Sequence, residues 1–273
     1  MIHSPNSRPR SIFLFLTDKE SVTVLNVFKT LQKAVSHPDN ALILFHQKEP
    51  VITDALKNLN PFLFTYESLL DLNYIPIVMN IVPGSNHFPV LQFFLNYQHY
   101  DHYWVVEDDV RFTGEWQYLF DFFNDYDHDF ISCHIRRFEQ EPEWFWWGSL
   151  VHRFKNIPVD MRIRSFNPIY RISKRALHFI HCTLQEQWKG HHEVLLPTLL
   201  YHNGYKILDF GGDGDFIAVG SQDRFYTSSC GDPKGVLSEG TMRFRPVWNE
   251  PGDKINKLYH PVKVRENKKV LIV

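Results

Sequence analysis

Residues 103–112 read YWVVEDDVRF, and this stretch decides which fold we expect. Four apolar and aromatic residues are followed directly by three carboxylates, Glu107, Asp108 and Asp109. In an open α/β sheet, ligands bind in the crevice outside the carboxyl ends of the strands. A buried strand that ends on acidic side chains therefore predicts a binding site at that edge, provided that strands and helices alternate in the sequence before it.

The first hundred residues do show this alternation. Short apolar runs predict buried strands, and stretches with apolar residues at helical spacing predict the helices between them. In chain order we expect strand 12–16, helix 21–35, strand 41–45, helix 51–59, strand 75–82, helix 89–97 and strand 103–106. This series is typical of a sheet with crossover helices.

The second half of the sequence is less regular. Residues 168–172 predict a strand that leads into a helix at 174–180, and residues 192–204 predict a helix that ends at Gly204, because glycine commonly terminates helices. Seven glycines between positions 211 and 240 predict loops. We find no internal repeat across residues 1–273, and the pattern predicts an α/β fold with a sheet flanked by helices.

The composition limits the classes of function. The 273 residues carry 29 Lys and Arg against 31 Asp and Glu, a net charge of −2, so a general nucleic-acid binder is not expected. Apolar residues make up 44% and supply ample material for a core. The 23 Phe, 12 Tyr and 7 Trp are an excess of aromatic residues without an excess of basic ones, which fits either flat, weakly charged ligands or a bulky core.

Cysteines and apolar segments bear on the compartment. Cys133, Cys182 and Cys230 are odd in number and lack CxxC spacing, so neither a zinc ribbon nor a disulfide framework is indicated, and a reducing compartment is expected. The run at 12–16 is too short for a signal peptide, and no window approaches the roughly 18 apolar residues of a membrane span. We expect a cytoplasmic protein without a transmembrane segment, and peripheral contact with the inner membrane face stays open.

The acidic cluster has two interpretations. Three adjacent negative charges repel one another, and a divalent cation would relieve that repulsion. Oxygen ligands favour Mg²⁺ or Mn²⁺ over zinc, and such an ion would in turn bind a diphosphate that the carboxylates alone would repel. The alternative is a solvated acidic turn in which Arg111 is the ion-pair partner.

Beyond these local features, the sequence resembles a known family. The position of VVEDDV (105–110) after a β/α half resembles the DXD motif of nucleotide-sugar glycosyltransferases of the GT-A fold. The longer stretch 81–116, with FNPIYRISKRAL at 166–177 and LYHPVK at 258–263, is similar to a group of GT-A glycosyltransferases found in bacteria and fungi. The resemblance extends over about residues 10–265.

The resemblance implies an architecture for the whole chain. It implies a GT-A-like, Rossmann-like mixed sheet in one domain. The implied parts are a nucleotide-sugar-binding half at 10–110, an acceptor-binding half at 111–265 and a basic tail at 266–273.

The resemblance also assigns roles at the acidic cluster. Asp109 would be a direct metal ligand, and Glu107 or Asp108 would touch ribose or sugar hydroxyls. His260 would complete the metal site, because a neutral imidazole adds a ligand without adding negative charge. Lys263 would offset charge on the leaving phosphate. The alternative for His260, which precedes a proline, is a structural role.

Glu193 is the candidate base. An inverting sugar transfer needs a group that takes the proton from the acceptor hydroxyl. Glu193 begins the helix EVLLPTLL, where a carboxylate is stabilised by the helix N-terminus. The alternative is a first-turn or capping glutamate without a catalytic role. The neighbouring His191 and His192 do not complete HExxH, so a zinc-protease motif is excluded.

Aromatic and loop residues complete the candidate set. In EWFWWGS, Trp144, Trp146 and Trp147 are candidates for stacking on acceptor sugars, with core packing as the alternative. Asn86 and His87, in the loop PGSNHFP, are candidates for contact with a nucleotide, with a turn and helix cap as the alternative.

These features together predict an enzyme. The expected function is a glycosyltransferase that uses Mn²⁺ or Mg²⁺ and moves a sugar from a nucleoside-diphosphate sugar, with a UDP-sugar favoured, to a glycan or lipid-linked saccharide acceptor. Inversion with a carboxylate base is favoured. Two alternatives stay open: a metal-dependent phosphoesterase that uses the same carboxylates with His191, His192 or His260, and a non-catalytic carbohydrate-binding module that binds through the tryptophans.

Overall fold

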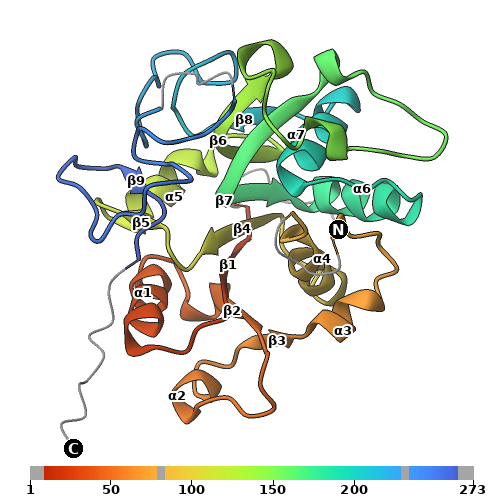
Figure 1. The fold of residues 1–273 in the computed structure, drawn as a ribbon. Coiled ribbons are helices and arrows are strands. Elements are labelled where there is room, and N and C mark those ends of the chain that lie inside the picture. The colour runs from red at the N-terminus through yellow and green to blue at the C-terminus, as the bar shows by residue number, and fades with distance from the viewer. Residues whose placement is uncertain (1–8, 79–83, 229–233, 264–273) are drawn as a thin grey trace, which may run out of the picture.

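One seven-stranded sheet runs through the part of the chain that the computed structural model describes, residues 9–78, 84–228 and 234–263 (Figure 1). Its strand order is β3-β2-β1-β4-β7-β6-β8, and a two-stranded ribbon of β5 and β9 lies beside it. The strands are β1 Ser11–Thr17, β2 Ala41–His46, β3 Phe62–Phe64, β4 His102–Glu107, β5 Arg111–Phe112, β6 Phe130–Arg137, β7 Ile163–Ser173, β8 Ile207–Asp209 and β9 Leu258–Tyr259.

Helices connect these strands and cover both faces of the sheet. They are α1 Val22–Lys33, α2 Asp54–Lys57, α3 Tyr66–Leu70, α4 His87–Asn96, α5 Trp116–Asn124, α6 Lys174–Gln185 and α7 His192–His202, with 3₁₀ turns at Pro38–Asn40, Phe138–Gln140, Trp147–Ser149 and Val159–Met161. None of the helices described is long and apolar enough to cross a membrane.

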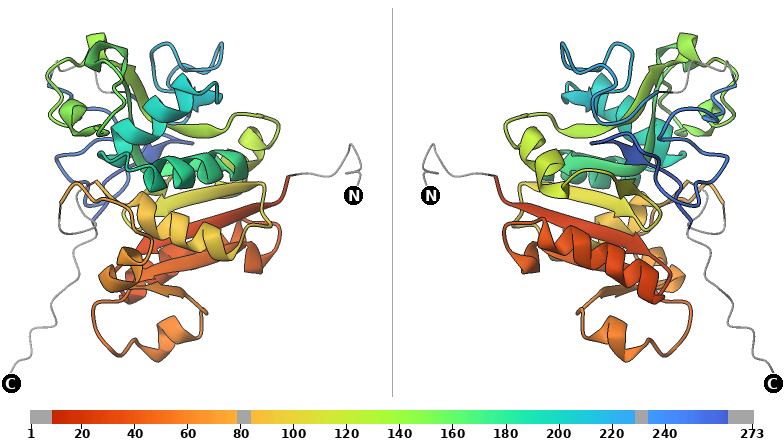
Figure 2. Two further views of the ribbon diagram at one scale, coloured as in Figure 1. Left: turned by 90° about the vertical axis from the view of Figure 1, so that its right-hand side faces the viewer. Right: turned by 90° about the vertical axis from the view of Figure 1, so that its left-hand side faces the viewer.

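Two apolar cores lie on opposite faces of the sheet, because successive strand residues point to opposite sides. In β1, Leu14 belongs to the core under α4, α6 and α7, whereas Phe15 belongs to the core under α1 and α5. The same division holds in β4 for Val105 and Val106. Figure 2 shows α4 and α6 on one face and α1 on the other. The predicted fold class, a mixed sheet flanked by helices in one domain, is confirmed.

The strand directions fix where a ligand can bind. The strands β1, β2, β3 and β4 are parallel, whereas β7 runs antiparallel to both β4 and β6. The chain moves outward from β1 to β2 and β3 and then returns to place β4 on the other side of β1. At such a change of direction, the loops after the two central strands diverge and leave a crevice. The loops in question begin at Thr17 and Glu107.

Several predicted elements differ from the structure. Residues 75–78 of the predicted strand 75–82 form no strand, and residues 79–82 lie outside the described residues. The third strand is instead Phe62–Phe64, a short edge strand. Helix α5 and the buried strands β6 and β8 were not predicted; in β6, polar residues interrupt the apolar pattern. Of the three cysteines, Cys230 lies outside the described residues, and Cys133 and Cys182 are free thiols.

The ribbon of β5 and β9 brings the end of the chain to the sheet. Arg111 pairs with Tyr259 and Phe112 with Leu258, so the residues just before Arg111 face those just after Tyr259. The backbone N–H of Val262 donates to the carbonyl of Asp109 at 2.8 Å and fastens this arrangement. This arrangement places His260 beside the acidic cluster.

Candidate functional site

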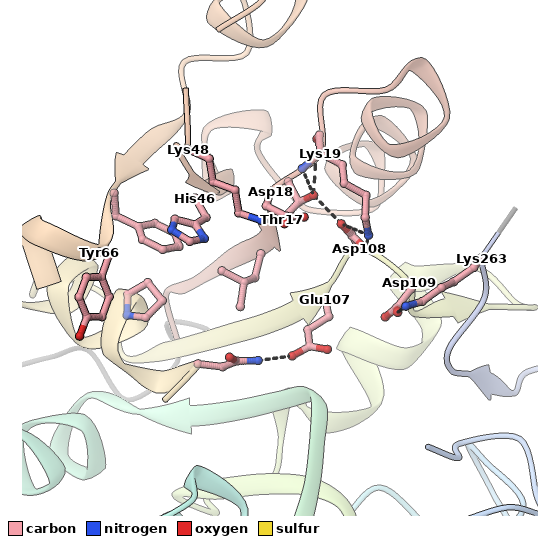
Figure 3. Close-up of a pocket in the computed structure, with 14 residues that line it drawn as sticks. Thr17, Asp18, Lys19, His46, Lys48, Tyr66, Glu107, Asp108, Asp109 and Lys263 are labelled. Carbon is pink, nitrogen blue, oxygen red and sulfur yellow. Dashed lines mark hydrogen bonds and ion pairs between the residues drawn. The ribbon is translucent and has the colours of Figure 1, made fainter. Parts of the chain in front are cut away.

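A pocket of about 590 Å³ opens at the carboxyl ends of the four parallel strands (Figure 3). Its volume lies within the range of small-molecule sites. The pocket is lined by residues that follow β1, β2, β3 and β4, by the start of α4 and by one residue of the C-terminal segment; they are Leu16, Thr17, Asp18, Lys19, His46, Lys48, Phe64, Tyr66, Asn86, Pro89, Glu107, Asp108, Asp109 and Lys263. The acidic cluster therefore lies where the strand–helix pattern predicts a binding site.

The middle carboxylate of the cluster is occupied by protein partners. Asp108 is buried, accepts a hydrogen bond from the Thr17 hydroxyl at 2.6 Å and binds the Lys19 ammonium at 2.7 Å. Arg111, the expected ion-pair partner in the solvated-turn interpretation, donates instead to the backbone carbonyls of Asp108 and Val110. Asp108 thus holds Lys19 at the pocket rather than offering free oxygens to a ligand.

The two outer carboxylates meet His260 and form a candidate metal centre. One ligand atom each from Glu107, Asp109 and His260 lies within 4.8 Å of the others. Nε2 of His260 is 3.2 Å from Oδ1 of Asp109 and 4.0 Å from Oε2 of Glu107. Oδ1 of Asp109 is buried and makes no hydrogen bond to any described residue. A buried carboxylate oxygen whose close neighbours are a histidine nitrogen and a second carboxylate is the chemistry that a hard divalent cation satisfies.

The tautomer of His260 also fits a metal ligand. Nδ1 lies 2.9 Å from the carbonyl oxygen of Arg243, which only accepts hydrogen bonds, so Nδ1 carries the proton. In the neutral ring, Nε2 then has the lone pair, and it faces the two carboxylates. Metal-ligating histidines almost always donate their other ring nitrogen to a carbonyl or carboxylate in this way. The residues present therefore fit a bound divalent cation.

The ionisation of these groups reflects their crowding. Burial raises the pKa of Glu107 to about 7, with Asp109 adding to the rise, and His260 and Asn86 oppose it. Burial also acts to raise the pKa of Asp109, but His260, Lys263 and Lys19 outweigh it and hold that pKa below its ordinary value. For His260, burial is outweighed by Asp109 and Glu107, so its pKa is raised. A metal ion would take the place of the proton that this trio shares.

Lysines line the same pocket. Lys19 is bound to Asp108, Lys48 binds Asp18 at 2.5 Å, and Nζ of Lys263 lies 3.7 Å from Oδ2 of Asp109. Each of the three lysine side chains is about half exposed, so each can reach a ligand. Figure 3 shows Lys263 beside Asp109 and Lys19 directed at Asp108. Lys263 is the one of these lysines that the sequence identified.

The two loop candidates before α4 separate in the structure. Asn86 lines the pocket, and its amide donates to Oε1 of Glu107 at 2.9 Å. Oδ1 of Asn86 is buried without a hydrogen bond to any described residue, so it is free to accept one from a ligand. His87 does not face the pocket: its side chain is 2% exposed and stacks on His192 with ring centroids 6.1 Å apart. The expected contact of His87 with a nucleotide is thus not seen, because its ring packs inside the domain.

Glu193 lies in the first turn of α7, and its side chain is 12% exposed. It accepts a 3.3 Å hydrogen bond from the backbone N–H of Asn167. Burial raises its pKa to about 7, although Arg164 and this hydrogen bond act in the opposite direction. The N-cap of α7 is His191, whose Nδ1 accepts from the backbone N–H of Glu193, so Glu193 does not cap the helix. Glu193 is not among the residues that line the pocket. Its partner Asn167 is preceded by Phe166, whose ring centroid lies 5.2 Å from that of His260.

The three tryptophans differ in exposure. Trp144 and Trp147 are 8% and 3% exposed; the face of Trp144 is covered by the Arg164 guanidinium at 4.1 Å, and Nε1 of Trp147 donates to the carbonyl of Glu141. These two rings belong to the core. Trp146 is half-buried and stacks on His191 at 4.8 Å. Of the three, Trp146 is the one that keeps surface available for a ligand.

Sequence reasoning missed the other wall of the pocket. Thr17, Lys19, His46, Lys48 and Tyr66 all line it, and each follows or ends one of the parallel strands. The signal was present, since TDK follows the run 12–16 and HQK follows 41–45. The rule that identified Glu107 and its neighbours, polar residues directly after a buried strand, applies equally to these segments.

Comparison with known proteins gives matches to solved structures alone. No protein-family model and no curated protein matches the sequence. The chain is similar to a glucosyl-3-phosphoglycerate synthase from Mycobacterium tuberculosis in complex with Mn²⁺, UDP and phosphoglyceric acid, with 12% identity, a TM-score of 0.43, and 73% of this chain and 68% of that one covered. It is also similar to a mannosyltransferase from Pyrobaculum calidifontis in complex with GDP-Man and Mn²⁺, with 12% identity, a TM-score of 0.43, and coverage of 80% and 58%.

Proposed function

We propose that this protein is a metal-dependent glycosyltransferase that moves a sugar from a nucleoside-diphosphate sugar, with a UDP-sugar favoured, to a glycan or lipid-linked saccharide acceptor. One observation carries the proposal: Glu107, Asp109 and His260 form a partly buried cluster of potential metal ligands, and Glu107 and Asp109 line a ligand-sized pocket that three lysines also line. Metal and lysine charges together suit a diphosphate. The arrangement explains how a chain of net charge −2 would hold an anionic donor.

The metal end of the pocket would hold the leaving group. Bound Mn²⁺ or Mg²⁺ would supply positive charge that stabilises the nucleoside diphosphate as the bond to the sugar breaks. Asp109, Glu107 and His260 are its ligands in this proposal. Lys263, half exposed beside Asp109, adds charge to the same phosphates, and Lys19 is held towards the pocket by Asp108.

The opposite end of the pocket would hold the nucleoside. His46 and Phe64 stack with ring centroids 5.1 Å apart and an interplanar angle of 4°, and Tyr66 lies beside them in the lining. Aromatic side chains suit a flat base, and burial together with Lys48 lowers the pKa of His46, so the ring is neutral at pH 7. Asn86 offers its unpaired oxygen to a hydroxyl of the ribose or the sugar. The pocket falls within residues 10–110, except for Lys263.

Glu193 is the proposed base, and the transfer is proposed to invert. A general base works best when its pKa lies close to the working pH, and burial brings the pKa of Glu193 to about 7. Ionised Glu193 would accept the proton of the acceptor hydroxyl as that oxygen attacks the anomeric carbon. The acceptor is then bound by residues of the 111–265 half, with Trp146 beside His191 as its sugar-stacking surface.

The alternatives have less support. A two-metal phosphoesterase needs carboxylates from several strand ends, whereas the described residues hold a single trio of potential ligands. A carbohydrate-binding module that uses the tryptophans loses two of its rings to the core. A carbohydrate-binding module also does not explain why aromatic rings and potential metal ligands share one pocket.

The products of the reaction test the proposal. The purified protein is incubated with UDP-, GDP- and dTDP-sugars, Mn²⁺ and a panel of saccharide acceptors, and the products are identified by mass spectrometry. The proposal predicts a glycosylated acceptor with release of the nucleoside diphosphate, both abolished by EDTA.

Other products point elsewhere. A nucleoside monophosphate with a sugar phosphate would indicate phosphoesterase chemistry and contradict transfer. Glycan binding that EDTA does not affect, without turnover, would indicate a binding module. For substitutions of glutamates in the site, the control variant is E186Q, which changes an exposed glutamate directly after α6.

A further inference from the structure

His134 is a strained, buried residue in the middle of the sheet. It lies in β6 with a φ of 47° and no exposed surface. The pairing of β6 with β7 shifts register on either side of Cys133, so this part of the strand bulges. A non-glycine residue in the left-handed region costs on the order of 1 to 3 kcal/mol and persists where its surroundings hold it there. The side-chain contacts of His134 indicate what role this strained conformation serves.

The ring of His134 acts as a hydrogen-bond donor to a single carbonyl. Nε2 lies 2.7 Å from the carbonyl oxygen of Met242, so Nε2 carries the proton. The backbone N–H of His134 donates to the Tyr226 hydroxyl at 2.7 Å instead of to a neighbouring strand. Nδ1 is buried with no hydrogen-bond partner among the described residues. The positive φ and the unpaired nitrogen both cost free energy, and the hydrogen bond to Met242 is the side-chain contact made in this conformation.

Met242 belongs to the segment that holds His260. The backbone N–H of His260 donates to Thr241 at 3.0 Å, and the N–H of Arg243 donates to the carbonyl of His260 at 3.1 Å. The same Arg243 accepts the 2.9 Å hydrogen bond from Nδ1 of His260 that sets its tautomer. Residues 241–243 therefore fix the backbone, the ring orientation and the protonated nitrogen of His260. The carbonyl of Met242 is the point at which His134 holds this segment.

Phe166 fills the space between the two histidines. Its ring centroid is 6.0 Å from that of His134 and 5.2 Å from that of His260. The sheet thus contacts both Met242 and His260: His134 donates a hydrogen bond to the carbonyl of Met242, and the Phe166 ring packs on the ring of His260. The Phe166 ring sets how closely His260 approaches the sheet, whereas the hydrogen bond from His134 orients the carbonyl of Met242.

We propose that His134 is a positioning residue for the metal centre: by donating to the carbonyl of Met242, it fixes residues 241–243 and with them the direction of Nε2 of His260. The proposal rests on the proposed metal site of Glu107, Asp109 and His260. Groups behind metal-ligating histidines typically change metal affinity 10- to 100-fold when they are removed. His134 acts one residue further away, so the lower end of that range applies.

Two substitutions separate the hydrogen bond from the backbone strain. Asparagine tolerates a positive φ, but its amide nitrogen stops about where Nδ1 lies and does not reach Met242. Glutamine is one atom longer and places its amide nitrogen at the distance of Nε2. H134N therefore removes the hydrogen bond, and H134Q keeps it. His102, at the opposite end of β4 from Glu107, supplies the control variant H102N.

The test is the Mn²⁺ affinity of the folded, full-length protein, measured by calorimetry without nucleotide, with the melting temperature recorded for each variant. We expect about tenfold weaker Mn²⁺ binding for H134N, and affinities within about threefold of wild type for H134Q and H102N. H134G, which has no strain at this φ, replaces H134N if the latter does not fold. Failure of both to fold would contradict a positioning role and indicate a folding role.

The possible failures are distinguishable. If the wild-type protein does not bind Mn²⁺, the proposed function fails. If the wild type binds Mn²⁺ and folded H134N binds it equally well, the role of His134 is refuted and the metal site stands. If H134Q weakens binding as much as H134N, the hydrogen bond to Met242 is not the cause.

Discussion

Glu193 illustrates at the scale of one residue how the burial of an ionisable group opposes stability. It lies in the first turn of α7, where the helix N-terminus favours a carboxylate, yet burial makes ionisation unfavourable and raises its pKa from 4.5 to about 7. The folded protein therefore binds this proton more tightly than the unfolded chain does. Stability from the protonated carboxyl is fully present below pH 4.5, is lost as the pH rises to about 7, and stays lost above it.

The variant E193Q should consequently be more stable than wild type at alkaline pH. Glutamine does not ionise, so the advantage of E193Q in free energy of unfolding should grow between pH 4.5 and 7 and approach about 3 kcal/mol at pH 8. Urea unfolding at pH 4.5 and pH 8 measures this difference. The exposed control E186Q should change stability by less than about 1 kcal/mol at both values. An E193Q advantage that does not depend on pH would contradict the raised pKa.

The same substitution should strongly reduce catalysis but leave donor binding unchanged. Since Glu193 is the proposed base and lies outside the pocket lining, E193Q should lower kcat by about 10²- to 10⁴-fold, with unchanged affinity for Mn²⁺ and UDP. In the wild type, kcat should fall as the pH drops below about 7, because the protonated carboxyl cannot accept a proton. Initial rates between pH 5 and 9 and nucleotide calorimetry measure both effects. A pH profile that is flat through 7 would exclude Glu193 as the base.

At the scale of elements, the segment that carries Trp144 and Trp146 is joined to the sheet by a buried ion pair. Arg164 of β7 and Glu141 are 2% and 3% exposed and lie 2.8 Å apart, and the guanidinium also stacks on Trp144. Each charge is tolerated in the interior only while the other is present, because either one alone would be buried without compensation. This pair fixes Trp144 and the turn that follows it, and so positions Trp146 beside His191.

Breaking that pair should be costly. R164M leaves Glu141 buried without its partner, and we expect it to lower the free energy of unfolding by about 3 to 5 kcal/mol. The double variant R164M/E141Q should recover part of the loss, because no unpaired charge remains. K155M removes one partner of the exposed pair with Glu186 and should cost less than about 1 kcal/mol. Denaturant unfolding checks all three; similar costs for R164M and K155M would contradict a structural role of the buried pair.

How far the sequence predicts these elements depends on their surroundings. The strands β1, β2 and β4 were predicted because both of their faces are apolar, and Gly204 indeed follows α7 with a positive φ. β6 was missed because Ser132, His134 and Arg136 place polar atoms in the interior, where these side chains form hydrogen bonds to distant segments. Local sequence does not contain those partners, so periodicity alone does not identify such a strand.

The candidate site follows the same rule. Glu107 and Asp109 were recognisable from their place after a strand, whereas His260 came from the family resemblance, because the β5–β9 ribbon that brings it to them is a long-range pairing. Lys19 and His46 follow predicted strands and were within reach of the same reasoning. The burial of His87 and Trp147 depends on how α4 and the Trp147–Ser149 turn pack, which a motif does not reveal.

At the scale of the whole molecule, the chain combines an excess of aromatic residues with a net charge close to zero. The two cores on either side of the sheet take up most of the aromatic rings, Phe15, Phe28 and Trp104 among them. Three lysines and two of the three potential metal ligands meet at one pocket, and in the proposed function the lysines and the bound metal supply the positive charge for an anionic donor. The account therefore requires that metal and nucleotide bind together.

The most direct test of this requirement is calorimetric titration of UDP into the protein, with Mn²⁺ and then with EDTA. The titration compares the wild type, D109N and the control D127N, which changes an exposed carboxylate that does not line the pocket. The account predicts UDP binding to the wild type and to D127N in Mn²⁺, at least tenfold weaker binding of both in EDTA, and binding to D109N in Mn²⁺ that is as weak as that of the wild type in EDTA. Equal UDP affinity of wild type and folded D109N in Mn²⁺ would contradict it.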